Sequence, residues 1–275
     1  MIINPMIDLV LHQMYVIQLC KKFYYKSTEE KLNVNIQKNL CEKADSLRFE
    51  NLYREAVSMY LNAILIDRKS AESYYGLGVC YKNLKDYEKA INALENAVKI
   101  RSEYYDAYYE LGICYQLKGV NCGAIKNFVK AVQIKPNSAE AILQLGISHE
   151  LCEENDLALM IYQKLIENSP DFIRAYDHKS SLLMKMDKYK DASKTLNKLL
   201  KKDPEYYSAY AGMGVCFEKL GKYSFARRYY RKFLTLNPFS AQRNFITNRL
   251  EKIKNNNLIL SSNKQMLKLI NYPVG

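Results

Sequence analysis

A chain of 275 residues is long enough to bury a substantial core, and its 41 basic and 29 acidic residues give a net charge of +12. The longest uncharged stretch near the start, residues 9–20, has only twelve residues, whereas a membrane-spanning helix needs about 20 apolar ones. The first ten residues lack lysine and arginine, and the seven cysteines stand mostly in helical patterns. We therefore expect a cytoplasmic protein with reduced thiols and neither a secretory signal nor a transmembrane segment.

Residues 1–36 are expected to form a helical extension that caps the fold. Asn4 and Pro5 suit a helix start, because asparagine caps the first turn and proline is tolerated within it. Residues 6–20 are apolar around most of a helix circumference, so they should be buried. Three alternatives stay open for this segment: packing on the neighbouring helices or in their groove, self-association through residues 1–25, and contact with a membrane surface.

Residues 37–240 repeat with a period of 34 residues, without insertion or deletion. Small residues at the eighth and twentieth places let two antiparallel helices approach closely, while larger apolar residues at places four, seven, eleven and twenty-four fill the space around them. Proline at the thirty-second place ends the second helix in the last four units. One hairpin cannot bury its apolar face alone, so the units should stack. The six units are 37–70, 71–104, 105–138, 139–172, 173–206 and 207–240; place eight holds Ala44, Gly78, Gly112, Gly146, Ser180 and Gly214, and place twenty holds Ala56, Ala90, Ala124, Ala158, Ala192 and Ala226.

The stretch YYGLGVCYKNLKDYEKAINALENAVKI, from Tyr74 to Ile100, resembles the tetratricopeptide repeat (TPR) family. The resemblance extends over residues 37–240, about three quarters of the chain. It implies an all-α, right-handed superhelical solenoid in which the first helix of each unit lines a concave groove for a partner. The chain should then be a non-catalytic interaction scaffold or adaptor that binds a peptide segment in this groove.

Cysteine returns at the tenth place of three units, as Cys80, Cys114 and Cys216. Serine or leucine stands there in the other units, so the place serves packing and holds no metal ligand. The three histidines show no metal-binding spacing, and no glycine loop cradles a phosphate. No serine or cysteine has a base placed by any local signature. We expect no cofactor, no metal and no enzymatic activity.

In the TPR family the exposed places of the first helix are chiefly two, five, nine and twelve, with place six beside them. The residues known to grip chaperone C-termini are absent from these places, and the groove is apolar and aromatic across units two to four. The expected partner is a protein or peptide segment with apolar anchors and flanking basic residues. The alternative for the aromatic residues is that compositional bias placed tyrosine on a half-exposed face. The expected contacts are Tyr75, Val79, Lys82, Asp106, Tyr109, Glu110, Ile113, Gln116, Glu140, Leu143, Gln144, Ile147 and Asp177, and units five and six also offer Arg174, Ser181, Ala211 and Val215.

Charge is concentrated towards the C-terminus. Unit four has a net charge of −6, whereas residues 173–275 carry 21 basic and seven acidic residues, a net charge of +14. Such runs form either a solvated outer face or a surface for nucleic acid, another polyanion or an acidic partner. The candidate polyanion contacts are Arg227, Arg228, Arg231 and Lys232.

Residues 241–256 should form a C-terminal capping helix, and residues 257–275 a tail that forms a short helix or docks on the array. The apolar stripe of the capping helix comprises Ala241, Phe245, Ile246, Leu250 and Ile253. Beside the adaptor function, two alternatives stay open: a binder of nucleic acid or another polyanion through residues 173–275, and a regulatory subunit of a larger enzyme.

Overall fold

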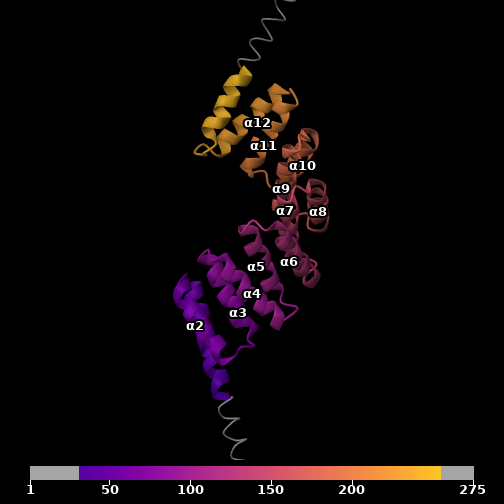
Figure 1. The fold of residues 1–275 in the computed structure, drawn as a ribbon. Coiled ribbons are helices and arrows are strands. Elements are labelled where there is room, and N and C mark those ends of the chain that lie inside the picture. The colour runs from indigo at the N-terminus through magenta and orange to yellow at the C-terminus, as the bar shows by residue number, and fades with distance from the viewer. Residues whose placement is uncertain (1–30, 255–275) are drawn as a thin grey trace, which may run out of the picture. The chain divides into compact units, whose positions relative to one another are not determined.

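The computed structural model describes residues 31–254, and every regular element in that range is an α-helix (Figure 1). Residues 31–49 are helical, so the first helix runs across residue 37 without a break. The expected all-α fold of repeated helical hairpins is confirmed. The further helices are α2 (Tyr53–Ile66), α3 (Ala71–Asn83), α4 (Tyr87–Ile100), α5 (Tyr105–Leu117), α6 (Asn121–Ile134), α7 (Ala139–Leu151), α8 (Asn155–Asn168), α9 (Ile173–Lys185), α10 (Tyr189–Lys202), α11 (Tyr207–Lys219) and α12 (Tyr223–Leu236), followed by helical residues 243–254.

The chain divides between Pro136 and Asn137 into two compact units. The N-terminal unit contains α2–α6, and the C-terminal unit contains α7–α12. Within each unit consecutive helices pack together, and first helices of neighbouring hairpins also touch, as α3 does α5 and α9 does α11. These first helices form one face of each unit, which we call the first-helix face. No helix within residues 31–254 has the length and apolar character to span a bilayer.

The two helices of a hairpin come closest where a small residue of the first helix packs against a large residue of the second. A Cβ atom on Gly78 would lie 2.5 Å from Cγ of Leu94, and one on Gly112 would lie 2.5 Å from Cε1 of Phe128. Both partners stand at place twenty-four of the same unit. The alanine at place twenty has 0% exposed surface in all six units. The backbones of a hairpin therefore approach so closely that only small side chains fit between them.

The turn between the two helices of a hairpin has the same geometry in all six units. Its fifteenth place has a positive φ, at glycine in two units and at other residues in four: Gly119 and Gly221, then Asn51, Lys85, Glu153 and Asp187. The following amide donates to the carbonyl five residues back, for example Glu154 N to His149 O at 3.0 Å. This is the pattern that commonly ends a helix at a left-handed residue.

Replacing Glu153 by glycine should stabilise the C-terminal unit. Glu153 has a φ of 62°, and a left-handed conformation costs a residue with a Cβ about 1–2 kcal/mol, of which the backbone entropy of glycine offsets about half. We expect a gain of about 0.5–1 kcal/mol in the free energy of unfolding, measured by urea titration. Asp187→Gly should gain less, because aspartate tolerates this conformation better. A loss of stability in Glu153→Gly would contradict the assigned turn.

The C-terminal helical residues 243–254 pack on the last hairpin. Ile246 and Ile253 are buried with Ala226, Tyr230 and Phe233. Arg249 donates two hydrogen bonds to the Glu218 carboxylate, from Nε at 2.8 Å and from Nη2 at 3.0 Å. Phe245 departs from the expected buried stripe, because its side chain is 54% exposed.

Two expectations concern residues outside the described range. The burial or self-association expected for residues 1–25 lies there, as does the tail, residues 257–275. Both stay predictions.

Candidate functional site

In the N-terminal unit, the first-helix face holds an ion pair between two expected contact residues. Lys82 Nζ on α3 donates to Glu110 Oε2 on α5 at 2.7 Å, and the two side chains are only 21% and 16% exposed. The pair joins neighbouring hairpins and uses charges that we expected a partner to meet. Asp106 remains exposed, while Ile113 and Gln116 are half-buried on the same helix.

Side chains of the aromatic strip expected on this face pack partly against other residues of the protein. The Tyr75 ring lies 5.2 Å from that of Tyr104, and burial raises its pKa above the ordinary tyrosine value. Tyr109 packs edge-on against Phe128 at 5.8 Å. Val79 is 7% exposed, so its expected place on an open wall is wrong. It packs in the core instead.

In the C-terminal unit, the first-helix face also differs from the expectation at one residue. Leu143 is fully buried, in one cluster with Ala175 and Tyr176 of α9, so it cannot anchor a partner. Glu140 pairs with Arg174 at 2.6 Å, and both side chains are about half exposed. Gln144 and Ile147 are half-buried on α7. Thus only part of the expected strip is accessible.

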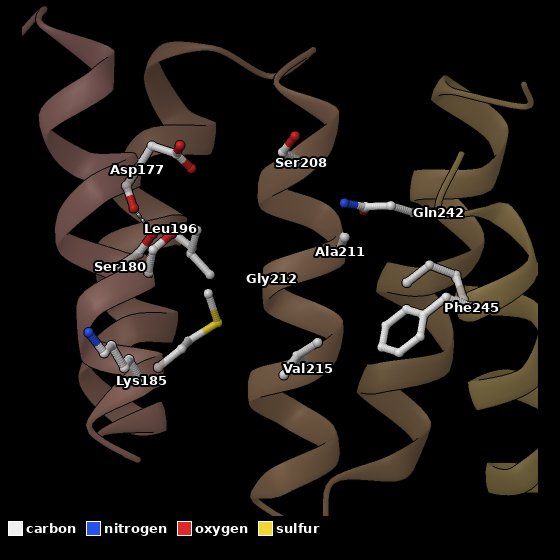
Figure 2. Close-up of a pocket in the computed structure, with 13 residues that line it drawn as sticks. Asp177, Ser180, Lys185, Leu196, Ser208, Ala211, Gly212, Val215, Gln242 and Phe245 are labelled. Atoms are coloured by element: carbon white, nitrogen blue, oxygen red, sulfur yellow. Dashed lines mark hydrogen bonds between the residues drawn. The ribbon is translucent and has the colours of Figure 1, made fainter. Parts of the chain in front are cut away.

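The same face opens into a pocket between α9, α11 and the C-terminal helical residues. Its volume is about 740 Å³, large enough for several side chains of a partner. Figure 2 shows α11 in the centre, with Asp177 of α9 on one side and Gln242 and Phe245 on the other, while the amino group of Lys185 points away from α11. The lining residues are Asp177, Ser180, Ser181, Met184, Lys185, Leu196, Ser208, Ala211, Gly212, Val215, Gln242, Phe245 and Ile246.

Small side chains along α11 make this pocket possible. Ser208, Ala211, Gly212 and Val215 line its back wall, and they stand at the family's partner-facing places two, five, six and nine. At place six the other units carry Glu42, Gly76, Glu110, Gln144 and His178, most of which would fill the space. A Cβ atom on Gly212 would already lie 3.0 Å from Cδ1 of Leu196.

The walls of the pocket combine an apolar surface with opposite charges at its two ends. Phe245 supplies an aromatic side chain that is 54% exposed, and Met184 lines the opposite wall. Asp177 and Lys185 are eight residues apart on α9, which places them about 12 Å apart along the helix. Burial, followed by the charge of Asp177, raises the pKa of Tyr206 to about 12.

Sequence reasoning found part of this lining. Asp177 was an expected contact, and Ser181, Ala211 and Val215 were recognised at the same family places. Met184, Lys185, Gly212, Gln242 and Phe245 were missed. The signal for Gly212 was its small size at a place that holds a larger residue in four of the other five units. Phe245 was assigned to the buried stripe of the capping helix.

The repeated cysteines lie in the core. Cys80, Cys114 and Cys216 are 0% exposed, and burial raises the pKa of their thiols to about 11, 12 and 11 respectively. Within residues 31–254, no three histidine, cysteine or acidic side chains come together as a metal site. The places of these three thiols agree with a packing role.

The three core thiols should resist modification in the folded protein. Their raised pKa values leave almost no thiolate at pH 8, and the reagent cannot reach them. Exposed Cys122 should react rapidly with a disulfide reagent, and the modified peptide that contains this residue should be absent from Cys122→Ser. Cys80, Cys114 and Cys216 should react only in urea, as followed by mass spectrometry of modified peptides. Rapid labelling of the three without urea would contradict the packing role.

The expected polyanion contacts lie on α12 but do not form one exposed patch. Arg228, Arg231 and Lys232 are exposed, whereas Arg227 is half-buried. The Nε atom of Arg227 is buried and has no hydrogen-bond partner in the described part of the chain. None of the four forms an ion pair with another residue in the 31–254 range. Three of the four charges are thus available on the outer helix.

Three family models described as tetratricopeptide repeat match the chain, at residues 71–104, 140–171 and 179–241. The first two ranges lie within the repeated region, residues 37–240, and the third extends one residue beyond it. No curated protein sequence matches the chain.

Solved structures share the fold at low sequence identity. YrrB, described as a TPR protein with an unusual peptide-binding site, is 20% identical with a TM-score of 0.57, and the match covers 70% of this chain and 97% of YrrB. PilW, a type IV pilus biogenesis factor, is 18% identical with a TM-score of 0.64, covering 77% of this chain and 98% of PilW. PilF of Pseudomonas aeruginosa is 14% identical with a TM-score of 0.62, covering 79% and 99%. These likenesses concern the fold alone.

Proposed function

The chain belongs to the tetratricopeptide repeat family, and from that premise we propose that it is a non-catalytic adaptor that binds a segment of another protein. The observation that carries the proposal is the pocket between α9, α11 and residues 243–254. Its lining places coincide with those that the family uses for partners, and it contains an exposed aromatic side chain. The peptide-binding site named for YrrB supports the same class of function.

The pocket suits a partner segment with one apolar anchor side chain. Its back wall is built from small residues, so depth is available, while Phe245 and Met184 offer apolar contact on both sides. Interfaces draw most of their affinity from a few such buried anchors. An aliphatic or aromatic side chain of the partner would fill the space above Gly212.

The charges at the two ends give the segment a direction. Asp177 would pair with a basic residue of the partner and Lys185 with an acidic residue. Their separation of about 12 Å corresponds to three or four residues of an extended peptide. The partner would therefore carry a basic and an acidic residue on opposite sides of its anchor. These pairs would contribute more to orientation and association rate than to affinity.

The accessible expected contacts of the N-terminal unit are proposed as a second contact surface for the same function. They comprise Asp106, Tyr109, Ile113 and Gln116 on α5, with the Lys82–Glu110 pair beside them. Asp106, which is exposed, would favour a basic partner segment there. The cytoplasm stays our proposed location, because the recurring cysteines occupy core packing places rather than the loops in which disulfide frameworks form.

A selection from a displayed peptide library against the full chain tests the pocket. Selected peptides should share an apolar anchor flanked by a basic and an acidic residue. Phe245→Ala should weaken their binding at least tenfold, because an aromatic contact of this kind typically contributes about 2 kcal/mol. Phe239→Ala is the matched control, since Phe239 is 96% exposed and outside the pocket. Equal binding by the parent and Phe245→Ala would refute the assigned site.

A further inference from the structure

Lysine stands in two of the six units at a place that the other four units fill with an apolar side chain. At place seven the second, third, fourth and sixth units carry Leu77, Leu111, Leu145 and Met213, and the first unit has the exposed Lys43. The fifth unit has Lys179, which is half-buried on α9. Its Nζ donates to Oε1 of Gln163 on α8. The family packing does not account for a charge here.

Lys179 faces a second pocket, formed by α8, α9 and α10, with a volume of about 460 Å³. Leu183 forms part of its apolar lining and is 5% exposed. Four lysines and one acid line it: Lys179, Lys188, Lys194, Lys198 and Asp191. The pocket therefore has a net charge of +3 at neutral pH.

Two of these lysines are neutralised within the protein and two are not. Lys194 Nζ lies 3.0 Å from Asp191 Oδ1, and Lys188 Nζ lies 3.7 Å from Asp156 Oδ1. Lys179 and Lys198 form no ion pair with any residue that the structure describes. Burial and then the charge of Lys198 lower the pKa of Lys179, while Glu167 and Asp191 oppose this effect. The half-buried ammonium group of Lys179 and the exposed one of Lys198 thus repel each other.

We propose that this pocket binds a phosphate monoester dianion between Lys179 and Lys198. Its two negative charges match the two unpaired ammonium groups, and a compact tetrahedral anion suits lysine, which recognises phosphate as a point charge. Lys194 at the rim would add a third donor. The site shares α9 and α10 with the pocket that Phe245 lines, but it uses other side chains of these helices. It therefore goes beyond the adaptor function and would let the protein sense phosphorylation of a partner or a free phosphorylated metabolite.

Calorimetry on the full chain tests the site with two probes, the tripeptide Gly-phosphoserine-Gly and glycerol 3-phosphate. Lys179→Met should weaken binding at least tenfold without loss of folding, because methionine already stands at this place as Met213. Lys198→Gln should have a similar effect. Lys201→Gln, an exposed residue on the same helix outside the pocket, is the matched control and should bind like the parent. Saturation by either probe supports recognition of the phosphate group, and their relative affinities distinguish a protein-borne source from a free one.

The ionisation of Lys179 gives a second readout. In the NMR spectrum of lysine side chains, the pKa of Lys179 should rise when probe is added, since an anion favours the charged ammonium. Methyl sulfate, a monoanion of the same shape, should bind at least tenfold more weakly than the phosphate probes. The proposal fails if neither probe saturates the protein at low salt, or if Lys179→Met and Lys198→Gln bind like the parent.

Discussion

Ala90→Leu should lower the free energy of unfolding by about 3 kcal/mol, the upper end of the usual cost of overpacking a filled core. Ala90 is 0% exposed, and its carbonyl oxygen would lie only 3.2 Å from a Cβ atom on Gly78 of the facing helix. Three additional carbon atoms at this contact must force α3 and α4 apart. The measurement is urea unfolding followed by circular dichroism.

Lys99→Leu is the control for this substitution. Lys99 lies on the same helix, α4, but is exposed, so the added leucine meets no facing backbone. Its effect should stay within about 0.5 kcal/mol, as for most surface changes. If Ala90→Leu unfolded at the same urea concentration as Lys99→Leu, the two helices could not be in the close contact that the repeat requires.

The helical hairpins were predictable because their determinants recur at fixed spacing within one unit. Gly78 and Leu94, or Gly112 and Phe128, are sixteen residues apart and meet within a single hairpin. A period of 34 residues therefore predicts both helices and the contact between them. The left-handed turn was not recognised, because glycine marks its fifteenth place in only two of the six units.

The accessible surface was harder to predict, because it depends on which neighbouring helix covers each place. Leu143 is buried with side chains of α9, although the same place is accessible as Asp177 one unit later. Lys82 and Glu110 were expected to face a partner and instead bind each other. The family places thus indicate the face of the array, while side-chain size and charge in adjacent units decide where that face is open.

The pocket could not be derived from the repeat alone, because one of its walls lies outside the repeated units. Phe245 and Gln242 belong to the C-terminal segment, whose position is fixed by packing against α12 and by contacts with α11. A helical wheel of residues 241–256 groups Phe245 with Ile246 on one apolar stripe. The structure separates them, burying Ile246 and leaving Phe245 at the pocket wall.

Glu218→Ala should both destabilise the C-terminal helical segment and abolish peptide binding. The Glu218 carboxylate on α11 accepts two hydrogen bonds from Arg249 and one from Tyr230, whose hydroxyl lies 2.7 Å away. Removing one partner of a buried ion pair costs about 3–5 kcal/mol. The Glu218 and Arg249 side chains are 22% and 23% exposed, so we expect the segment to lose about 2–3 kcal/mol of stability. The loss should be measured as faster amide hydrogen exchange in residues 243–254.

Peptide binding should be lost because residues 243–254 supply one wall of the pocket. When residues 243–254 detach, Phe245 leaves the pocket, and affinity for the selected peptides should fall more than in Phe245→Ala, which removes one side chain only. Glu251→Ala is the control, because Glu251 is an exposed acid on the same segment and should leave exchange and binding unchanged. Fast exchange in Glu218→Ala with undiminished peptide affinity would mean that the C-terminal segment is no part of the binding site. The peptide would then be held by α9 and α11 alone, through Asp177, Ala211 and Val215.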